Sequence, residues 1–183
     1  WNSTADGRPY LVMELLPGED LAHFLARTGA LPPSVAIPIV LQIADALQFI
    51  HDQGVVHRDL KPANVFLCRN GPYPNFVKLL DFGIAKRLRS PSGLRTDRAL
   101  LIGTPAYMSP EQVTEGAAHV DARTDQFALG LIAYEMLSGQ PAFYRPGDEL
   151  VVILTRVLTF TPPLLSDPPL DAVIRRAIHK EQR

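Results

Sequence analysis

The chain has little of what marks secreted or nucleic-acid-binding proteins. It contains one cysteine, Cys68, among 183 residues, which excludes an internal disulfide framework and suits a reducing compartment. Its 18 Lys and Arg residues are balanced by 19 Asp and Glu residues, so a net charge of -1 gives no case for a nucleic-acid partner. We expect Cys68 to be a small buried residue on a strand rather than a redox centre.

Long apolar runs and biased segments are also missing. The longest apolar stretch that we identify, residues 127–137, carries Glu135 and falls well short of the ~20 residues of a membrane-spanning helix. The chain opens without a signal-peptide pattern, and it has no internal repeat or low-complexity segment. Hydrophobic residues make up 46% of the chain and charged residues 20%, which is typical of one globular domain with a sizeable core.

Hydrophobic periodicity predicts a mainly helical domain with a small amount of strand. Gly29, Gly54 and Gly139 follow three of the predicted helices, where a residue that adopts positive φ commonly ends a helix. In chain order we expect a buried strand at 10–13, a connector at 14–18, a short helix at 20–28, a long helix from 32 to about 53, strands at 65–67 and 76–80, a long loop at 84–104, and helices at about 123–138, 147–158 and 170–181.

The richest chemistry lies in the stretch HRDLKPAN, residues 57–64. Asp59 can take a proton, Lys61 can neutralise a phosphate, and Asn64 can offer its side-chain oxygen to a metal ion. Asp81 follows further along the chain as a second acid. An acid, an ammonium and two oxygen ligands favour a site for Mg²⁺ and a nucleotide.

Five segments occur in a fixed order: YLVMELLPGEDL, HRDLKPANVFL, VKLLDFGIAK, GTPAYMSPEQ and DARTDQFALGLIAYEMLSGQPAF. This series resembles the C-terminal part of a eukaryotic-type (Hanks-type) Ser/Thr protein kinase domain, especially its bacterial members. The resemblance implies an α+β, mainly α fold. Residues 1–18 would be the end of the small lobe and the hinge, and residues 19–183 the large lobe, with a hinge strand and a small β-ribbon at the cleft. The rest of the small lobe is expected to be absent from this chain.

The resemblance also implies ATP-dependent phosphorylation of Ser or Thr in protein substrates, with Mg²⁺ as cofactor. Asp59 would be the catalytic base, and Lys61 would stabilise the γ-phosphate as it moves. Asn64 and Asp81 would hold Mg²⁺. Thr104 would pair with Lys61, an arrangement typical of Ser/Thr kinases rather than Tyr kinases.

An adenine site is implied by the same resemblance. Met13 would be the gatekeeper, while the Glu14 carbonyl and the Leu16 amide would bond the edge of the base. Phe66 would pack near the base, although ordinary core packing explains it equally well. Asp20 is either a ribose contact or an acid that stabilises the start of a helix.

Control by phosphorylation is implied by Arg58, which precedes the catalytic Asp. In relatives with this Arg, a phosphate on the activation loop pairs with it and orders the loop. Thr96 is the first candidate acceptor, followed by Ser90 and Ser92. The alternative for Thr96 is an ordinary exposed hydroxyl.

Structural roles are implied for the remaining motif residues. Asp125 would accept backbone N–H groups of the turn at residues 57–58, because a buried carboxylate without partners is costly. His57 and Phe82 would stack in the interior, and Gly83 would let the backbone swing Asp81. Glu111 would pair with an Arg that the family pattern puts two residues past the end of this chain, so Arg183 is not the expected partner.

Departures from the family pattern leave alternatives open. Ala63 stands where many relatives that prefer basic substrates carry a Glu, so a strong preference for Arg-rich substrates is not expected. A pseudokinase scaffold, a fragment that is inactive without the small lobe, and a small-molecule phosphotransferase are the competing functions. The kinase domain would be cytoplasmic, and a membrane anchor would have to lie outside this chain.

Overall fold

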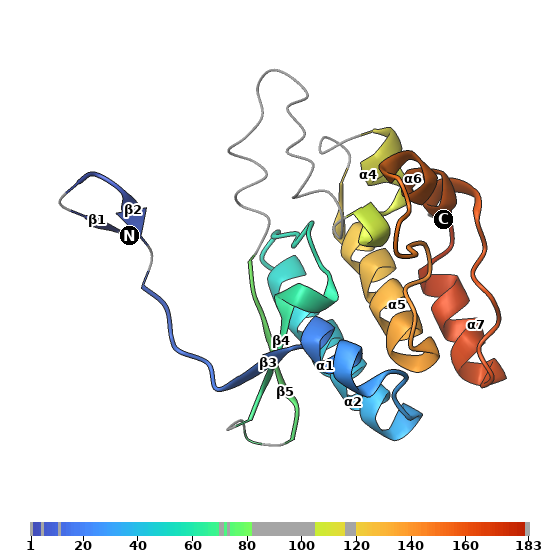
Figure 1. Cartoon of the computed structure of the whole chain (residues 1–183), viewed down its shortest axis with the longest axis horizontal. Coiled ribbons are helices and arrows are strands. Elements are labelled where there is room, and N and C mark those ends of the chain that lie inside the picture. The colour runs from blue at the N-terminus through green and yellow to red at the C-terminus, as the bar shows by residue number, and fades with distance from the viewer. Residues whose placement is uncertain are drawn as a thin grey trace.

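The computed structural model describes residues 2–4, 6–10, 12–69, 72, 74–81, 105–115 and 120–181, and every structural statement below refers to them. The elements in chain order (Figure 1) are β1 (Asn2–Ser3), β2 (Pro9–Tyr10), β3 (Gly18–Asp20), α1 (Leu21–Thr28), α2 (Pro33–His51), the 3-10 helix η1 (Pro62–Asn64), β4 (Val65–Cys68), β5 (Phe76–Leu79), the 3-10 helix η3 (Pro105–Tyr107), α4 (Pro110–Thr114), α5 (Ala122–Ser138), α6 (Leu150–Thr159) and α7 (Pro168–Ala177).

Helix α5 is the centre of the molecule, with α2 along one side and α7 along the other (Figure 1). Its apolar residues cover all faces, which is typical of a helix buried on every side. Ala128, Ile132 and Met136 face the cluster formed with α1, α2 and the sheet. Phe127 and Leu131 belong to a second cluster with α6 and α7. The polar residues Thr124 and Asp125, in the first turn of α5, are buried with this helix.

A three-stranded antiparallel sheet, in the order β3-β4-β5, lies against α2. Asp20 on β3 pairs with Phe66 on β4, and Phe66 pairs with Lys78 on β5. Gly18 is required where β3 begins, because a Cβ there would lie 2.0 Å from the carbonyl oxygen of Leu67. The sheet places the end of β5 beside η1.

Two helix ends follow the predicted sequence signals. The Asp20 carboxylate accepts the backbone N–H of His23 at 2.9 Å, so it caps α1. Gly139 adopts φ 73° and ends α5, with its N–H donated to the Glu135 carbonyl. Both boundaries were predictable, because capping depends on residues close in sequence.

The predicted strands at 65–67 and 76–80 are confirmed as β4 and β5, and the predicted helices correspond to α1, α2, α5, α6 and α7. Cys68 is confirmed as a buried, free cysteine on β4. Helix α7 ends at Ala177, earlier than expected. The predicted loop at 84–104 lies outside the described residues.

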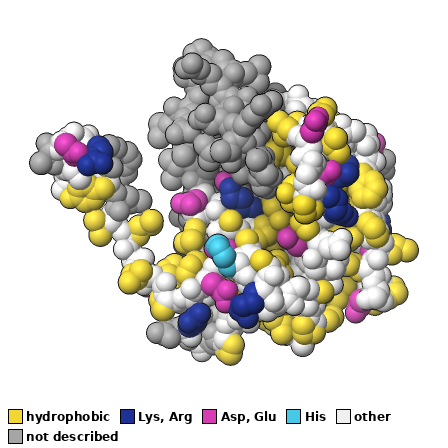
Figure 2. All heavy atoms as spheres, viewed as in Figure 1, with side chains coloured by type: hydrophobic (Ala, Val, Ile, Leu, Met, Phe, Trp, Pro, Cys, Tyr) yellow, Lys and Arg dark blue, Asp and Glu magenta, His cyan; other side chains and the backbone are white. Residues whose placement is uncertain are grey.

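The prediction of a buried hinge strand at residues 10–13 is wrong for this chain. Strand β2 stops at Tyr10 and pairs only with β1, in a hairpin that stands apart from the helices (Figure 1). Val12, Met13 and Leu15 are 79%, 72% and 92% exposed on the segment that joins this hairpin to β3 (Figure 2). The pattern was that of a strand, but among the described residues the segment has no sheet to join.

Helix α2 is a longer apolar element than the stretch at residues 127–137. With a mean hydropathy of 1.5, it is the one helix among the described residues that is long and apolar enough to cross a membrane. Its buried residues Ala36, Ile39, Ile43 and Leu47 belong to the core cluster with α5 and the sheet. Such packing is what the core helix of a globular domain requires.

The packing of α2 on α5 predicts a position-dependent loss of stability. Ile43 is fully buried, so Ile43→Ala should lower the free energy of unfolding by about 3 kcal/mol, from lost apolar burial and the cavity left behind. Leu41 lies on the same helix and is 58% exposed, so Leu41→Ala should cost less than about 1 kcal/mol. Denaturant unfolding checks both values, and equal losses would contradict this packing.

Candidate active site

Asp59, Lys61 and Asn64 form one hydrogen-bonded cluster. Lys61 Nζ lies 2.9 Å from Asp59 Oδ2. The side-chain amide of Asn64 donates to the Asp59 carbonyl at 2.8 Å and lies 3.4 Å from its carboxylate. Because η1 brings Asn64 back toward the preceding loop, three residues of the predicted site face one another.

Asp81 is brought to the same place by the sheet. Leu80 follows β5 and donates its N–H to the Asn64 carbonyl at 2.9 Å. Asp81 is the next residue, and its φ of 52° is left-handed, which is uncommon for a non-glycine residue. The structure thus places the backbone of Asp81 next to Asn64, while the Asp81 side chain is exposed.

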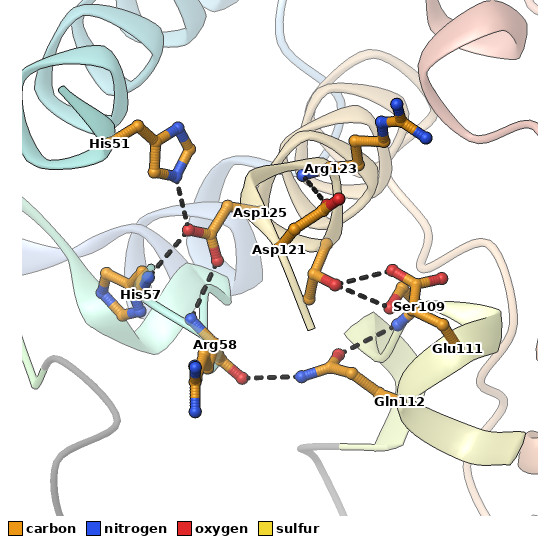
Figure 3. Close-up of polar contacts among 10 residues, drawn as sticks. His51, His57, Arg58, Ser109, Glu111, Gln112, Asp121, Arg123 and Asp125 are labelled. Atoms are coloured by element: carbon orange, nitrogen blue, oxygen red, sulfur yellow. Dashed lines mark hydrogen bonds and ion pairs between the residues drawn. The ribbon is translucent and has the colours of Figure 1, made fainter. Parts of the chain in front are cut away.

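The Asp125 carboxylate bonds the backbone of the segment 57–64, called the catalytic loop after its predicted role (Figure 3). It is fully buried in the first turn of α5. One oxygen accepts the Arg58 N–H at 2.8 Å, and the other accepts the His57 N–H at 2.8 Å and the His51 ring N–H at 2.8 Å. These donors satisfy a charge that would be costly to bury without partners. The expected anchoring role of Asp125 agrees with these contacts.

His57 has the surroundings of a structural residue. Its side chain is fully buried, and Nε2–H donates to the Leu80 carbonyl at 3.0 Å. Burial lowers the pKa of His57 below its ordinary value, although the negative charge of Asp125 acts in the opposite direction. A neutral imidazole that links the catalytic loop to the end of β5 fits the predicted structural role.

Helix α4 is joined to α5 by a chain of polar side chains (Figure 3). Thr124 donates its hydroxyl to Glu111 at 2.6 Å, and the buried hydroxyl of Ser109 donates to Thr124 at 3.3 Å. By the family pattern, the Arg expected to pair with Glu111 falls past the end of this chain. Arg183 lies outside the described residues.

Tyr107 and Glu135 form a partly buried pair. The Tyr107 hydroxyl donates to Glu135 Oε2 at 2.5 Å. Burial raises the pKa of Glu135, although this hydrogen bond lowers it in part. Burial and the Glu135 charge also raise the pKa of Tyr107 well above its ordinary value. Glu135 is therefore committed to an internal partner.

The donor set fits a magnesium–phosphate complex rather than a closed metal cage. Among the described residues, no group of three or more His, Cys, Asp or Glu side chains could hold a metal ion. Mg²⁺ commonly takes one or two protein ligands and completes its shell with phosphate oxygens and water. Asn64 donates its amide nitrogen to Asp59, so its side-chain oxygen is the atom that would face a cation together with Asp81.

The residues assigned to the adenine site do not form a cluster like that of Asp59, Lys61 and Asn64. Met13 is exposed, and Glu14 lies on the same extended segment, where its carboxylate bonds Lys78 of β5 at 2.5 Å. Leu16 and Phe66 are half-buried. Asp20 serves as the cap of α1, which supports the helix-start alternative for this residue.

Six predicted residues cannot be placed. Phe82, Gly83, Ser90, Ser92, Thr96 and Thr104 lie outside the described residues, so their roles stay predictions.

A wide surface pocket lies away from this cluster. It has a volume of about 900 Å³ and lies between the start of α5 and the end of α7, lined in part by Arg123, Phe127 and Lys180. Burial lowers the pKa of Lys180 to about 8. None of the predicted site residues lines this cavity.

Sequence reasoning missed two residues that support the catalytic loop. His51 belongs to no recognised motif, yet its ring bonds the buried Asp125 carboxylate that holds the loop. Gln112 was not singled out, yet its side-chain amide donates to the Arg58 carbonyl at 2.9 Å. Ser109 and Gln112 do form an S-x-x-Q capping pattern, which signals the start of α4 but not the contact with the loop.

Comparison with known proteins gives a consistent result. Residues 3–167 match the family model described as protein kinase domain. The chain is 39% identical over 178 residues to serine/threonine-protein kinase PknB of Mycolicibacterium smegmatis, covering 94% of this chain and 27% of that protein. It is also 39% identical over 171 residues to serine/threonine-protein kinase Pkn1 of Myxococcus xanthus, covering 93% of this chain and 24% of that protein. The chain thus spans about a quarter of the length of the curated relatives it matches.

Loss of the Asp125 carboxylate should destabilise the protein strongly. Asp125→Ala leaves buried N–H groups of the catalytic loop without an acceptor, so we expect a loss of about 3 kcal/mol or more in unfolding free energy. Asp121 provides the matched control, since it caps the same helix from an exposed position and Asp121→Ala should cost about 1 kcal/mol. Denaturant unfolding of both variants measures the difference, and similar losses would show that Asp125 is not an anchor.

Proposed function

The chain belongs to the protein kinase domain family, and from this we propose that it is the large lobe, with the hinge segment, of an enzyme that phosphorylates Ser or Thr in protein substrates. Residues 1–18 would be the hinge and the end of the small lobe, and residues 19–183 the large lobe. The exposed apolar side chains of Val12, Met13 and Leu15 support this division, because they offer a surface for further chain to cover.

The observation that carries the proposal is the cluster of Asp59, Lys61 and Asn64, with the backbone of Asp81 beside it. An acid, a cation and two oxygen donors at one place are what phosphoryl transfer needs, because that reaction depends on positioning and charge neutralisation. Separate structural explanations for each residue would leave their convergence unexplained.

In the proposed reaction Asp59 orients the acceptor hydroxyl and takes its proton as the hydroxyl oxygen bonds to the γ-phosphorus of ATP. The bond from that phosphorus to the bridging oxygen breaks, and ADP leaves. Lys61, held 2.9 Å from Asp59, stabilises the transferred phosphoryl group. Asn64 and Asp81 would hold Mg²⁺, which supplies charge neutralisation on the phosphates when bound.

The substrate class follows from what the site offers. Lys61, with Thr104 as its proposed partner, favours Ser or Thr acceptors. Ala63 stands where relatives that prefer basic substrates carry an acid. The other acid that could bind a substrate Arg, Glu135, is already bonded by Tyr107, so strong selection for Arg-rich substrates is not expected. The reaction would take place in the cytoplasm, where ATP is available.

Substitution of the proposed base tests the function directly. In the full-length protein that contains this chain, Asp59→Asn should reduce transfer of labelled phosphate to a protein substrate by at least about 10²-fold, because the proton acceptor is lost. Asp45→Asn makes the same chemical change at an exposed position on α2 and should leave the rate unchanged. Phosphate transfer that persists in Asp59→Asn would exclude this mechanism, and no transfer by the unsubstituted protein would favour a pseudokinase.

Regulation through Thr96 gives a second test. If a phosphate on Thr96 pairs with the Arg58 guanidinium, Thr96→Ala should lower activity several-fold, and Arg58→Ala should add little when both changes are combined. Phosphate mapping by mass spectrometry and initial rates of the single and double variants measure this coupling. An unchanged rate in Thr96→Ala, or fully additive losses, would refute it.

A further inference from the structure

We propose that Gln112 is a positioning residue: its side-chain amide holds the peptide between Arg58 and Asp59 in the orientation that presents the catalytic carboxylate. The inference rests on the proposed role of Asp59 as the base. It starts from the hydrogen bond of Gln112 Nε2 to the Arg58 carbonyl, at 2.9 Å (Figure 3).

The backbone at Arg58 needs such support. Arg58 has a φ of 65°, a left-handed conformation that costs a non-glycine residue about 1–2 kcal/mol. Without external contacts this residue would relax toward negative φ, which would reorient the peptide that leads into Asp59. A conformation of this kind persists only where surrounding contacts hold it.

The contacts hold the peptide groups on both sides of Arg58. Its N–H donates to Asp125 Oδ1 at 2.8 Å, which fixes the peptide before it. Its carbonyl accepts from Gln112, which fixes the peptide after it. The two partners come from different helices, α5 and α4, and Figure 3 shows them approaching the loop from different directions. Asp125 bonds only the first of these two peptides, so the contact to the carbonyl of the second peptide, the one that precedes Asp59, comes from Gln112.

The orientation of the Gln112 amide is determined by its surroundings. Its Oε1 accepts the backbone N–H of Ser109 at 3.1 Å, as part of the capping box of α4. A carbonyl can only accept and an N–H can only donate, so exchanging the amide nitrogen and oxygen would break both contacts. The side chain therefore carries two separable functions: an acceptor for the helix cap and a donor for the catalytic loop.

The contact is direct. The amide nitrogen of Gln112 lies 2.9 Å from the Arg58 carbonyl oxygen, a distance that leaves no room for a bridging water between these two atoms. A side chain of the same size that cannot donate would leave the Arg58 carbonyl without this partner.

The place of Gln112 in the chain means that its contact joins two different parts of the site. Helix α4 follows directly on the segment with η3, which in kinases shapes the groove for the protein substrate. Gln112 thus joins the substrate-side segment to the peptide of the catalytic base. Its loss should affect turnover more than nucleotide binding, because its bond is to the peptide that precedes Asp59 and not to a residue assigned to adenine.

The test is Gln112→Glu in the full-length protein. Glutamate keeps the acceptor for the Ser109 N–H and is a favoured residue at this position of a capping box, but it cannot donate to the Arg58 carbonyl when ionised. We expect kcat to fall by at least about fivefold, the fold-change that corresponds to one lost neutral hydrogen bond. The KM for ATP and the thermal midpoint should stay close to those of the unsubstituted protein. Gln140→Glu, the same change at an exposed residue at the far end of α5, should alter none of these values.

Hydrogen exchange separates failure of this inference from failure of the proposed function. Backbone amides of residues 57–64 should exchange several-fold faster in Gln112→Glu than in Gln140→Glu. If kcat and loop exchange are both unchanged in an active enzyme, Gln112 does not position Asp59. A fall in kcat that only accompanies a lower thermal midpoint would also overturn the inference, since it would reflect helix stability. If the unsubstituted protein transfers no phosphate, the proposed function fails and the exchange rates alone decide whether Gln112 holds the loop.

Discussion

The hydrogen bonds from the catalytic loop to the buried Asp125 carboxylate are the interaction on which the rest of the site depends. They attach the residues proposed to carry the chemistry to α5, which has more buried residues than any other helix in the described part of the chain. A carboxylate in the interior is tolerated only when donors surround it, and here backbone N–H groups and the His51 ring supply them. Burial of the charge and the position of the loop are thus one arrangement, since neither is favourable without the other.

Helix α5 makes this arrangement possible. Its apolar residues face α2 and the sheet on one side and α6 and α7 on the other, so its first turn lies inside the molecule. The same turn carries Thr124, which bonds Glu111 of α4, and Asp125, which bonds the loop. Hydrophobic packing therefore sets the position of the helix, and polar residues at its start transmit that position to the elements around the site.

Arg58 and Asp59 show how a strained backbone is used at this site. The left-handed turn at Arg58 has its N–H bonded by Asp125 and its carbonyl bonded by Gln112. Lys61 and Asn64 then contact Asp59 from its other side. Asp59, the proposed base, is surrounded by contacts from α5, α4 and η1. A small displacement of any of these elements would therefore move its carboxylate.

The sequence by itself determined the family, the cluster of Asp59, Lys61, Asn64 and Asp81, the β4–β5 ribbon and the positions of the main helices. These features depend on motif spacing and on caps such as Asp20 and Gly139, which act over a few residues. Only the tertiary structure decided that residues 12–15 are exposed, because a strand-like pattern cannot form a strand without a partner. It also decided that His51 and Gln112 contact the catalytic loop, since these bonds join residues 74 and 54 positions apart and no local pattern encodes such a distance.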